Sequence, residues 1–166
     1  MKIQKKFFQR IRILLLAAAS GTPFLQGTAQ DMKPTLFLIS DTHLDTQWNW
    51  NVKTTINDYI YKTMTENMAL MDKYPSFLPN YEGAIRYMWM KEYYPAEFER
   101  LKSYVASGQW HVSGLSVDAN DVMISSAESI LRNMLYANHF YMKEFGVRGG
   151  YDIMLPDCFG FSYALP

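Results

Sequence analysis

Residues 36–50 read Leu-Phe-Leu-Ile-Ser-Asp-Thr-His-Leu-Asp-Thr-Gln-Trp-Asn-Trp, an apolar run that turns polar within a few positions. The run over residues 36–39 has the length and the bulky or β-branched residues that are typical of a strand. Asp41, His43 and Asp45 follow at alternate positions, so an extended backbone would place these three side chains on one face. Ligands of α/β folds bind at the carboxyl ends of strands. The segment therefore predicts a strand that ends in a metal site.

Strand patterns alternate with amphipathic helix patterns along the rest of the chain. Further strands are expected over residues 77–81, 110–117 and 151–155. Helices are expected over residues 53–73, over residues 84–93, from Pro95 to a left-handed cap at Gly108, and from a capping box, Ser125-x-x-Glu128, to Gly146. Such alternation predicts the α/β class with a mostly parallel sheet.

Apolar residues at helical spacing mark the side of each helix that should face the core. In the first helix the methionines at 64, 68 and 71 belong to this stripe, and we interpret them as core residues rather than as a cofactor site. In the last helix the expected buried residues are Ile130, Leu131, Met134, Leu135, Met142 and Phe145.

The first 29 residues have the pattern of a secretory signal peptide. Five basic residues and no acidic ones precede a short apolar run over residues 13–19, and Gly27-Thr28-Ala29 offers a cleavage site before Gln30. The apolar run is too short to span a membrane. We therefore expect residues 1–29 to be removed, residues 30–166 to form the mature part, and the protein to be secreted or periplasmic.

Charge and cysteine content exclude several classes of function. Removing the five basic residues of the leader from the 16 of the chain leaves 11 against 16 acidic residues, a net charge of about −5. Such a chain does not favour nucleic acid or an anionic membrane as a partner. Cys158 is the only cysteine, so no internal disulfide can form.

A second motif, Leu155-Pro156-Asp157-Cys158-Phe159-Gly160-Phe161-Ser162, follows the last predicted strand. Together with His43-Leu44-Asp45 and Trp48, it resembles the catalytic domain of family 38 glycoside hydrolases, the α-mannosidases. That family has a His-x-Asp motif with a Trp three residues later, and an Asp-x-Phe-Gly motif followed by a Leu-Pro pair, which Leu165-Pro166 matches. The resemblance covers residues 36–166.

The resemblance implies a zinc-dependent retaining α-mannosidase that acts on a mannose-containing glycan or glycoside. His43 and Asp45 match two zinc ligands of the family, and Asp157 matches the residue that is both zinc ligand and nucleophile. Trp48 matches a tryptophan that packs against the sugar, and Asp121 aligns with a carboxylate near the substrate. The implied fold is the amino-terminal part of a seven-stranded β/α barrel. The oligomeric state cannot be read from the sequence.

The chain departs from the family pattern in two ways. Phe161 stands where many members have His, Tyr or Gln, so a polar contact at that position is lost. The family's fourth zinc ligand, a His, and its general acid, an Asp, lie further downstream than this chain extends. We therefore expect residues 30–166 to be a truncated part of the catalytic domain, nearly inactive alone, because general acid–base help is worth about 10²–10⁴ in rate.

Three alternatives remain open from the sequence. Asp41 and His43 also resemble the first motif of calcineurin-like metallophosphoesterases, but the only Asn-His pair, Asn138-His139, falls inside a predicted helix. A polysaccharide deacetylase would share a His and Asp metal site but explains the Asp-x-Phe-Gly motif less well. The third is a carbohydrate-binding remnant without catalysis. His111, His139 and Cys158 are interpreted as structural.

Overall fold

The computed structural model describes residues 34–36, 38–147, 152–155, 157, 159–160 and 163. The chain divides into the units Met1–Phe37 and Leu38–Pro166, and the elements below lie in the second unit. The predicted leader, 1–29, lies outside the described residues. Within the described part, no helix is both long and apolar enough to cross a membrane.

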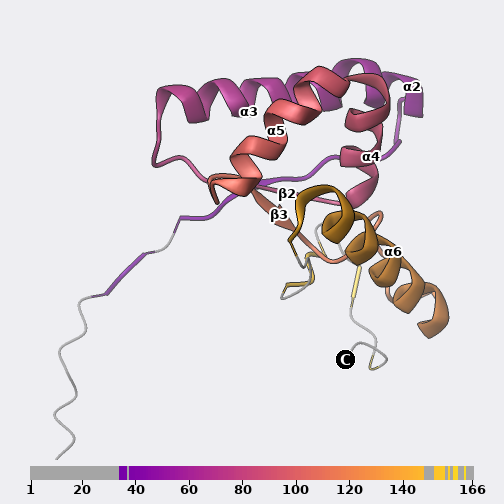
Figure 1. Cartoon of the computed structure of the whole chain (residues 1–166). Coiled ribbons are helices and arrows are strands. Elements are labelled where there is room, and N and C mark those ends of the chain that lie inside the picture. The colour runs from indigo at the N-terminus through magenta and orange to yellow at the C-terminus, as the bar shows by residue number, and fades with distance from the viewer. Residues whose placement is uncertain are drawn as a thin grey trace, which may run out of the picture. The chain divides into compact units, whose positions relative to one another are not determined.

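Three parallel strands form the sheet, in the order β1 (Ser40–Thr42), β2 (Pro79–Glu82) and β3 (His111–Ser113). Asp41 pairs with Asn80, and Asn80 pairs with His111, so the three strands run in register in one direction. Parallel neighbours need a crossover, and the intervening helices supply it (Figure 1). The parallel α/β class is therefore confirmed, whereas the described strands are too few to show a seven-stranded barrel.

The strands are shorter than expected. The predictions of strands over residues 36–39 and 151–155 are wrong for the residues that the structure describes. β1 begins at Ser40, and Leu36, Leu38 and Ile39 precede it with largely exposed side chains, because only residues 40–42 have partners on β2. Residues 152–155 form no strand. Instead the Asp152 carboxylate accepts hydrogen bonds from the Ser113 hydroxyl and the Gly114 N–H, and its carbonyl accepts one from the Leu115 N–H, so these bonds stand in place of the expected ladder.

The helices match the sequence prediction closely. The first is continuous through α2 (Val52–Thr54), a π-helical segment η1 (Thr55–Ile60) and α3 (Tyr61–Lys73), and it is followed by α4 (Ala84–Tyr93), α5 (Pro95–Ala106) and α6 (Ala127–Phe145). Gly108 and Gly146 both have positive φ after a helix, as predicted. The capping box was misplaced by one residue. Ser126 is the N-cap of α6 and accepts from the N–H of Ser129, while Glu128 pairs with Arg132 one turn later.

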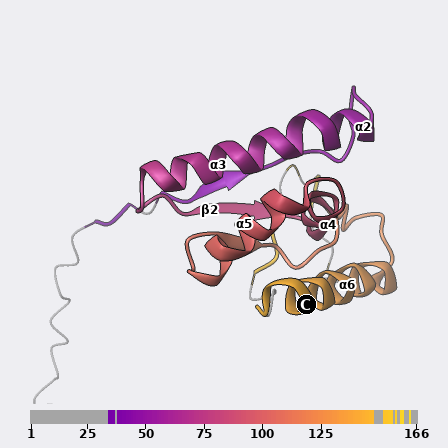
Figure 2. The ribbon, with the colours of Figure 1, turned by 45° about the horizontal axis from the view of Figure 1, so that its top comes forward.

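α4 and α5 lie between α3 and α6 (Figure 2), and the core fills the space between these helices and the sheet. The predicted core methionines of α3 are buried, which confirms their packing role. The other main core residues are Ile60, Tyr81, Tyr87, Met90, Phe98, Leu101, Val105, Trp110, Ala137 and Tyr141.

The outer face of α6 differs from the prediction. Ile130 is buried, but Leu131, Leu135 and Met142 are exposed, because α6 packs on α4 and α5 through the face that carries Ala137 and Tyr141. A wide apolar stripe was interpreted as one buried face, whereas the described neighbours cover only half of it.

Candidate active site

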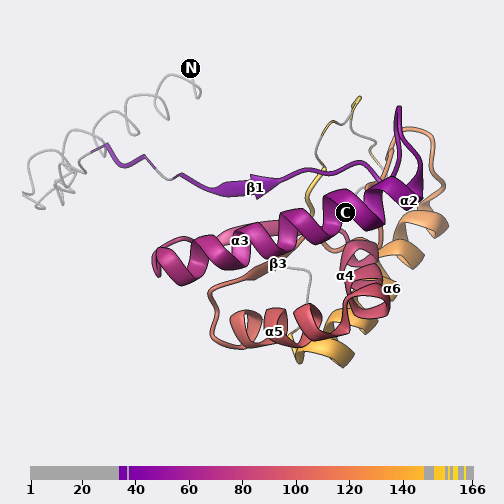
Figure 3. The same cartoon turned by 90° about the horizontal axis from the view of Figure 1, so that it is seen from above.

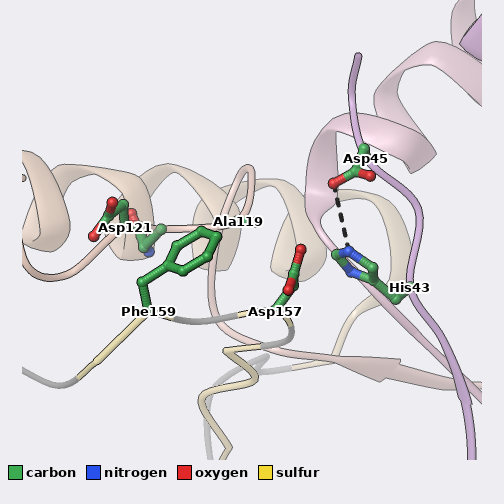
Figure 4. Close-up of a pocket in the computed structure, with 7 residues that line it drawn as sticks. His43, Asp45, Ala119, Asp121, Asp157 and Phe159 are labelled. Carbon is green, nitrogen blue, oxygen red and sulfur yellow. Dashed lines mark ion pairs between the residues drawn. The ribbon is translucent and has the colours of Figure 1, made fainter. Parts of the chain in front are cut away.

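The segment after β1 carries two of the predicted site residues. Nε2 of His43 lies 3.4 Å from Oδ1 of Asp45, and the two side chains are 32% and 39% exposed (Figure 4). The Thr55 hydroxyl, at the start of η1, donates to the carbonyl of Thr46 (2.7 Å) and accepts from the indole N–H of Trp50 (2.8 Å). These bonds fasten the segment to the helix that follows it.

The loop after β3 comes beside this segment. In Figure 3 the chain leaves β1 toward α2, and the loop that leads to α6 passes next to it. The Thr46 hydroxyl donates to the carboxylate of Asp118 and so joins the two segments. Asn133 of α6 holds the same loop, since its side chain accepts from the N–H of Val117 (2.7 Å) and donates to the Asn120 side chain (2.6 Å).

The third segment follows α6 in the sequence, lies against the end of β3 and leads to Asp157. Its start is anchored by Asp152, whose carboxylate lies 2.7 Å from the Ser113 hydroxyl oxygen and 2.9 Å from the Gly114 nitrogen. Asp157 itself has φ +48°, a left-handed conformation that residues other than glycine adopt uncommonly. Such backbone conformations cluster at functional sites, where the surrounding structure maintains them.

These three segments line one pocket of about 170 Å³, and His43, Asp45, Asp121 and Asp157 all face it. Figure 4 shows the Asp157 carboxylate between His43 and the loop of Asp121. The structure therefore brings together four of the five site residues named from the sequence. Small-molecule sites usually have volumes of about 300–1,000 Å³, so this pocket is small for a complete one.

Trp48, the fifth residue, does not line the pocket. Its side chain is 75% exposed and meets Trp50 edge-to-face, with 6.1 Å between the ring centroids. An exposed indole beside a polar pocket can pack against a sugar ring, but no described contact fixes its orientation toward the pocket.

Sequence reasoning missed three pocket residues, Ala119, Asn120 and Phe159. Phe159 belongs to the Asp-x-Phe-Gly motif, and its place two residues after the candidate nucleophile was the available signal. Asn120 stands directly before Asp121, which was named from the sequence, but no role was assigned to Asn120. Ala119 has no side-chain chemistry that a pattern could reveal.

A buried ion pair lies beside the pocket segments and was also missed. Glu82, on β2, and Arg86, on α4, are wholly buried, and Arg86 contacts Asp118 of the pocket loop. Burial raises the pKa of Glu82, although the Arg86 guanidinium opposes the shift. Burial also disfavours the charge of Arg86, but Glu82 and Asp118 outweigh it, so the pKa of Arg86 is raised.

The other residues named from the sequence contribute little to this pocket. His111 is exposed and lies 3.8 Å from Asp152, and the Asn138-His139 pair is inside α6, as predicted. Cys158 and Phe161 are outside the described residues. Among the residues that are described, no group of three His, Cys, Asp or Glu side chains is close enough to hold a metal ion.

Comparison with known proteins identifies the family of this chain. Residues 33–166 match the model of the "Glycosyl hydrolases family 38 N-terminal domain". The chain belongs to glycosyl hydrolase family 38. The family resemblance inferred from the two motifs is thereby confirmed.

Several curated relatives of this family 38 chain are named as α-mannosidases. Alpha-mannosidase G of Dictyostelium discoideum is 34% identical over 131 residues, which is 79% of this chain and 12% of that protein. Human alpha-mannosidase 2C1 is 28% identical over 91% of the chain and 14% of its own length, and the Saccharomyces cerevisiae alpha-mannosidase is 28% identical over 89% and 13%. The chain thus spans only about an eighth of the length of these relatives.

Proposed function

We propose that this chain supplies the first part of the active site of a zinc-dependent retaining α-mannosidase. The observation that carries the proposal is the single pocket in which His43, Asp45 and Asp157 meet, in a chain that belongs to family 38. The names of the relatives support mannose-containing glycans or glycosides as the substrate class. The three-stranded parallel sheet is consistent with the beginning of a seven-stranded β/α barrel.

The side chains of the pocket suit zinc by their chemistry. An imidazole and carboxylates are nitrogen and oxygen ligands that zinc accepts, and His43, Asp45 and Asp157 would hold the ion. Their present spacing is too wide for a complete three-residue site. A bound zinc ion would act as a Lewis acid that binds sugar hydroxyls and orients the ring.

Asp157 is the proposed nucleophile. In a retaining glycosidase, one carboxylate oxygen forms a bond to the anomeric carbon while the bond from that carbon to the leaving oxygen breaks. The leaving oxygen takes a proton from a second carboxylic acid, and water then hydrolyses the glycosyl ester. The exposed carboxylate of Asp157 lines the pocket and can make the attack, while we assign the general acid and a fourth metal ligand to parts of the protein outside this chain.

Substrate contacts are proposed for Asp121 and Trp48. Asp121 faces the pocket with a carboxylate that also accepts from the N–H of Met123 (3.0 Å), so its orientation toward sugar hydroxyls is restrained. Trp48 offers a solvent-exposed aromatic face close along the chain to Asp45.

The proposal is tested by hydrolysis of a chromogenic α-mannoside by the full-length protein that contains this chain. Asp157→Asn keeps the shape of the side chain but removes the nucleophile, and we expect it to lower kcat about 10⁴-fold or more. Asp58→Asn, on the exposed side of η1, is the matched control and should leave activity unchanged. A chelator should abolish activity, and added zinc should restore it.

Each alternative has its own outcome in that experiment. Folded, zinc-loaded protein that binds mannosides without hydrolysing them would support the carbohydrate-binding remnant. Cleavage of phosphodiesters would support the phosphoesterase, and release of acetate from acetylated polysaccharide would support the deacetylase. Any of these three results would overturn the mannosidase proposal.

We also propose that residues 1–29 direct export to the periplasm or the exterior and are then removed. The mass of the purified native protein tests this point, because cleavage predicts an amino terminus at Gln30. A mature protein that retains the basic leader would contradict it.

A further inference from the structure

Arg86 is a fully buried cation whose hydrogen bonds reach two pocket-bearing segments. It lies in the first turn of α4, and none of its side chain is exposed to solvent. Its Nη1 donates to Oδ1 of Asp118 (2.6 Å), and its Nη2 donates to the backbone carbonyl of Leu44. Oε1 of Glu82 lies 3.8 Å from the same Nη2.

The two hydrogen-bond partners of Arg86 belong to the segments that form the proposed site. Leu44 stands between His43 and Asp45, and Asp118 lies three residues before Asp121 in the loop after β3. These segments are more than 70 residues apart in the sequence, and the Thr46–Asp118 hydrogen bond is their other described polar link. One planar guanidinium therefore contacts both sides of the pocket.

The backbone around Arg86 is built to admit its side chain. A Cβ atom at Gly83 would lie 2.1 Å from Nη1 of Arg86, far inside van der Waals contact. Gly83 also has φ +84°, which side-chain-bearing residues rarely adopt. The glycine leaves a space that the guanidinium occupies, while the Arg86 N–H bonds to the Gly83 carbonyl (3.2 Å).

General stabilisation alone does not account for this arrangement well. A buried ion pair is costly to desolvate, and apolar side chains of similar volume often stabilise a core equally or better. The contacts of Arg86 are directed at a loop carbonyl and a loop carboxylate, which apolar residues could not hold. Guanidinium also presents several donors in a fixed plane, so lysine cannot bind Asp118 and Leu44 in the same geometry.

We propose that Arg86 is a positioning residue that sets the spacing between the His43–Asp45 segment and the Asp118–Asp121 loop, and thereby the affinity of the pocket for a divalent cation. The role in cation binding rests on the proposed function, whereas the role in spacing does not. Arg86 touches neither the substrate nor the metal. Ligand-orienting residues of this kind typically change metal affinity or activity 10–100-fold when they are replaced.

The test compares Arg86→Lys and Arg86→Met with Arg132→Lys and Arg132→Met in the full-length protein. Arg132 is an exposed arginine of α6 that pairs with Glu128, so its variants control for loss of one cation or one ion pair. Asp118→Asn is added in case an Arg86 variant fails to fold, because it keeps the arginine but weakens the hydrogen bonds that Asp118 accepts from both Arg86 and Thr46. The readouts are hydrogen exchange of peptides over residues 43–46, 117–121 and 95–106, and the dissociation constant for zinc measured against a competing chelator.

We expect faster exchange in both pocket segments of the Arg86 variants, unchanged exchange in α5, and a zinc dissociation constant raised about 10–100-fold. The Arg132 variants should match the wild-type protein in all of these. The inference would be overturned if the Arg86 variants showed wild-type exchange in the pocket segments or an unchanged zinc affinity. It would also be overturned if exchange in α5 became equally faster, because that result indicates only a global loss of stability. A wild-type protein that binds no zinc would refute the proposed function, and the exchange data would then decide the spacing role by themselves.

Discussion

Gly83→Ala should disrupt the site although it adds a single methyl group. The new Cβ would stand 2.1 Å from Nη1 and 3.1 Å from Cζ of Arg86, so the guanidinium must leave its position. Positive φ costs an alanine about 1–3 kcal/mol. Displacing the arginine from Asp118 and Leu44 leaves Glu82 buried without its cation, and breaking a buried ion pair costs about 3–5 kcal/mol.

Gly108→Ala separates these two contributions. Gly108 has φ +77°, but no atom lies within 4 Å of its virtual Cβ, so the substitution should cost only the backbone strain. The difference between the two variants should therefore be the cost of displacing Arg86, about 3–5 kcal/mol. Because 1.4 kcal/mol is a factor of ten, local opening should become at least about 100-fold more frequent.

Native-state hydrogen exchange measures this opening in the full-length protein, at conditions where exchange reports the opening equilibrium. The reporters are the amides of Ala84 and Ile85, which donate to the carbonyls of Ser116 and Val117 at 2.9 Å and join α4 to the pocket loop. The reasoning would be refuted if Gly83→Ala and Gly108→Ala changed the exchange rates of these two amides equally.

Three further predictions concern groups near the site. Burial raises the pKa of Glu82 above 4.5, so the stability that this residue contributes is fully present below pH 4.5 and is lost as the pH rises through the folded-state pKa. Over that range the unfolding free energy of the wild type, relative to that of Glu82→Gln, should fall by up to about 1.4 kcal/mol per pH unit, as measured by urea unfolding. Tyr87→Phe removes the hydroxyl that accepts from the indole N–H of Trp110 (2.9 Å), and leaving that buried donor unpaired should lower the unfolding free energy by about 1–3 kcal/mol, again in urea. Asp152→Ala releases Gly114 and the segment that leads to Asp157, so kcat for an α-mannoside should fall up to about 100-fold.

Each of these predictions has a control or a contradictory result. A difference between wild type and Glu82→Gln that grows with pH would show that Arg86 outweighs burial. Tyr93→Phe, at an exposed tyrosine of α4, should change stability by less than about 0.5 kcal/mol, and an equal loss in both tyrosine variants would contradict the role of the buried hydroxyl. Unchanged kcat in Asp152→Ala would show that the backbone bond from Leu115 N–H to the Asp152 carbonyl is a sufficient anchor.

The helices were predictable because their signals are local. The methionine stripe of α3, Pro95 at the start of α5 and Gly146 after α6 each act within a few residues of the chain. Strand extents were predicted less well, because a strand exists only where a partner lies beside it. The apolar residues 36, 38 and 39 have strand character but no pairing, so β1 begins only at Ser40.

The candidate site was predictable to the extent that it follows strand ends and motifs. His43, Asp45, Asp121 and Asp157 were named from sequence. His43, Asp45 and Asp121 meet because β1 and β3 are parallel and direct their following loops to the same edge, whereas Asp157 follows no described strand and comes from a segment that Asp152 anchors at the end of β3. Trp48 was named by the same motif but lies outside the pocket lining, and its exposed indole meets Trp50 edge-to-face.

The amino-acid sequence by itself determined the order of the helices and of the first three strands, the family, and the chemical types of the pocket residues, because propensity, capping and motif spacing are properties of short segments. Tertiary structure alone decided that a glycine at position 83 leaves room for Arg86, and that this buried cation joins segments about 70 residues apart. It also decided which half of the apolar stripe on α6 is covered. These features depend on which surfaces meet, and the burial of a charge or an apolar face is a property of neighbours that no local pattern encodes.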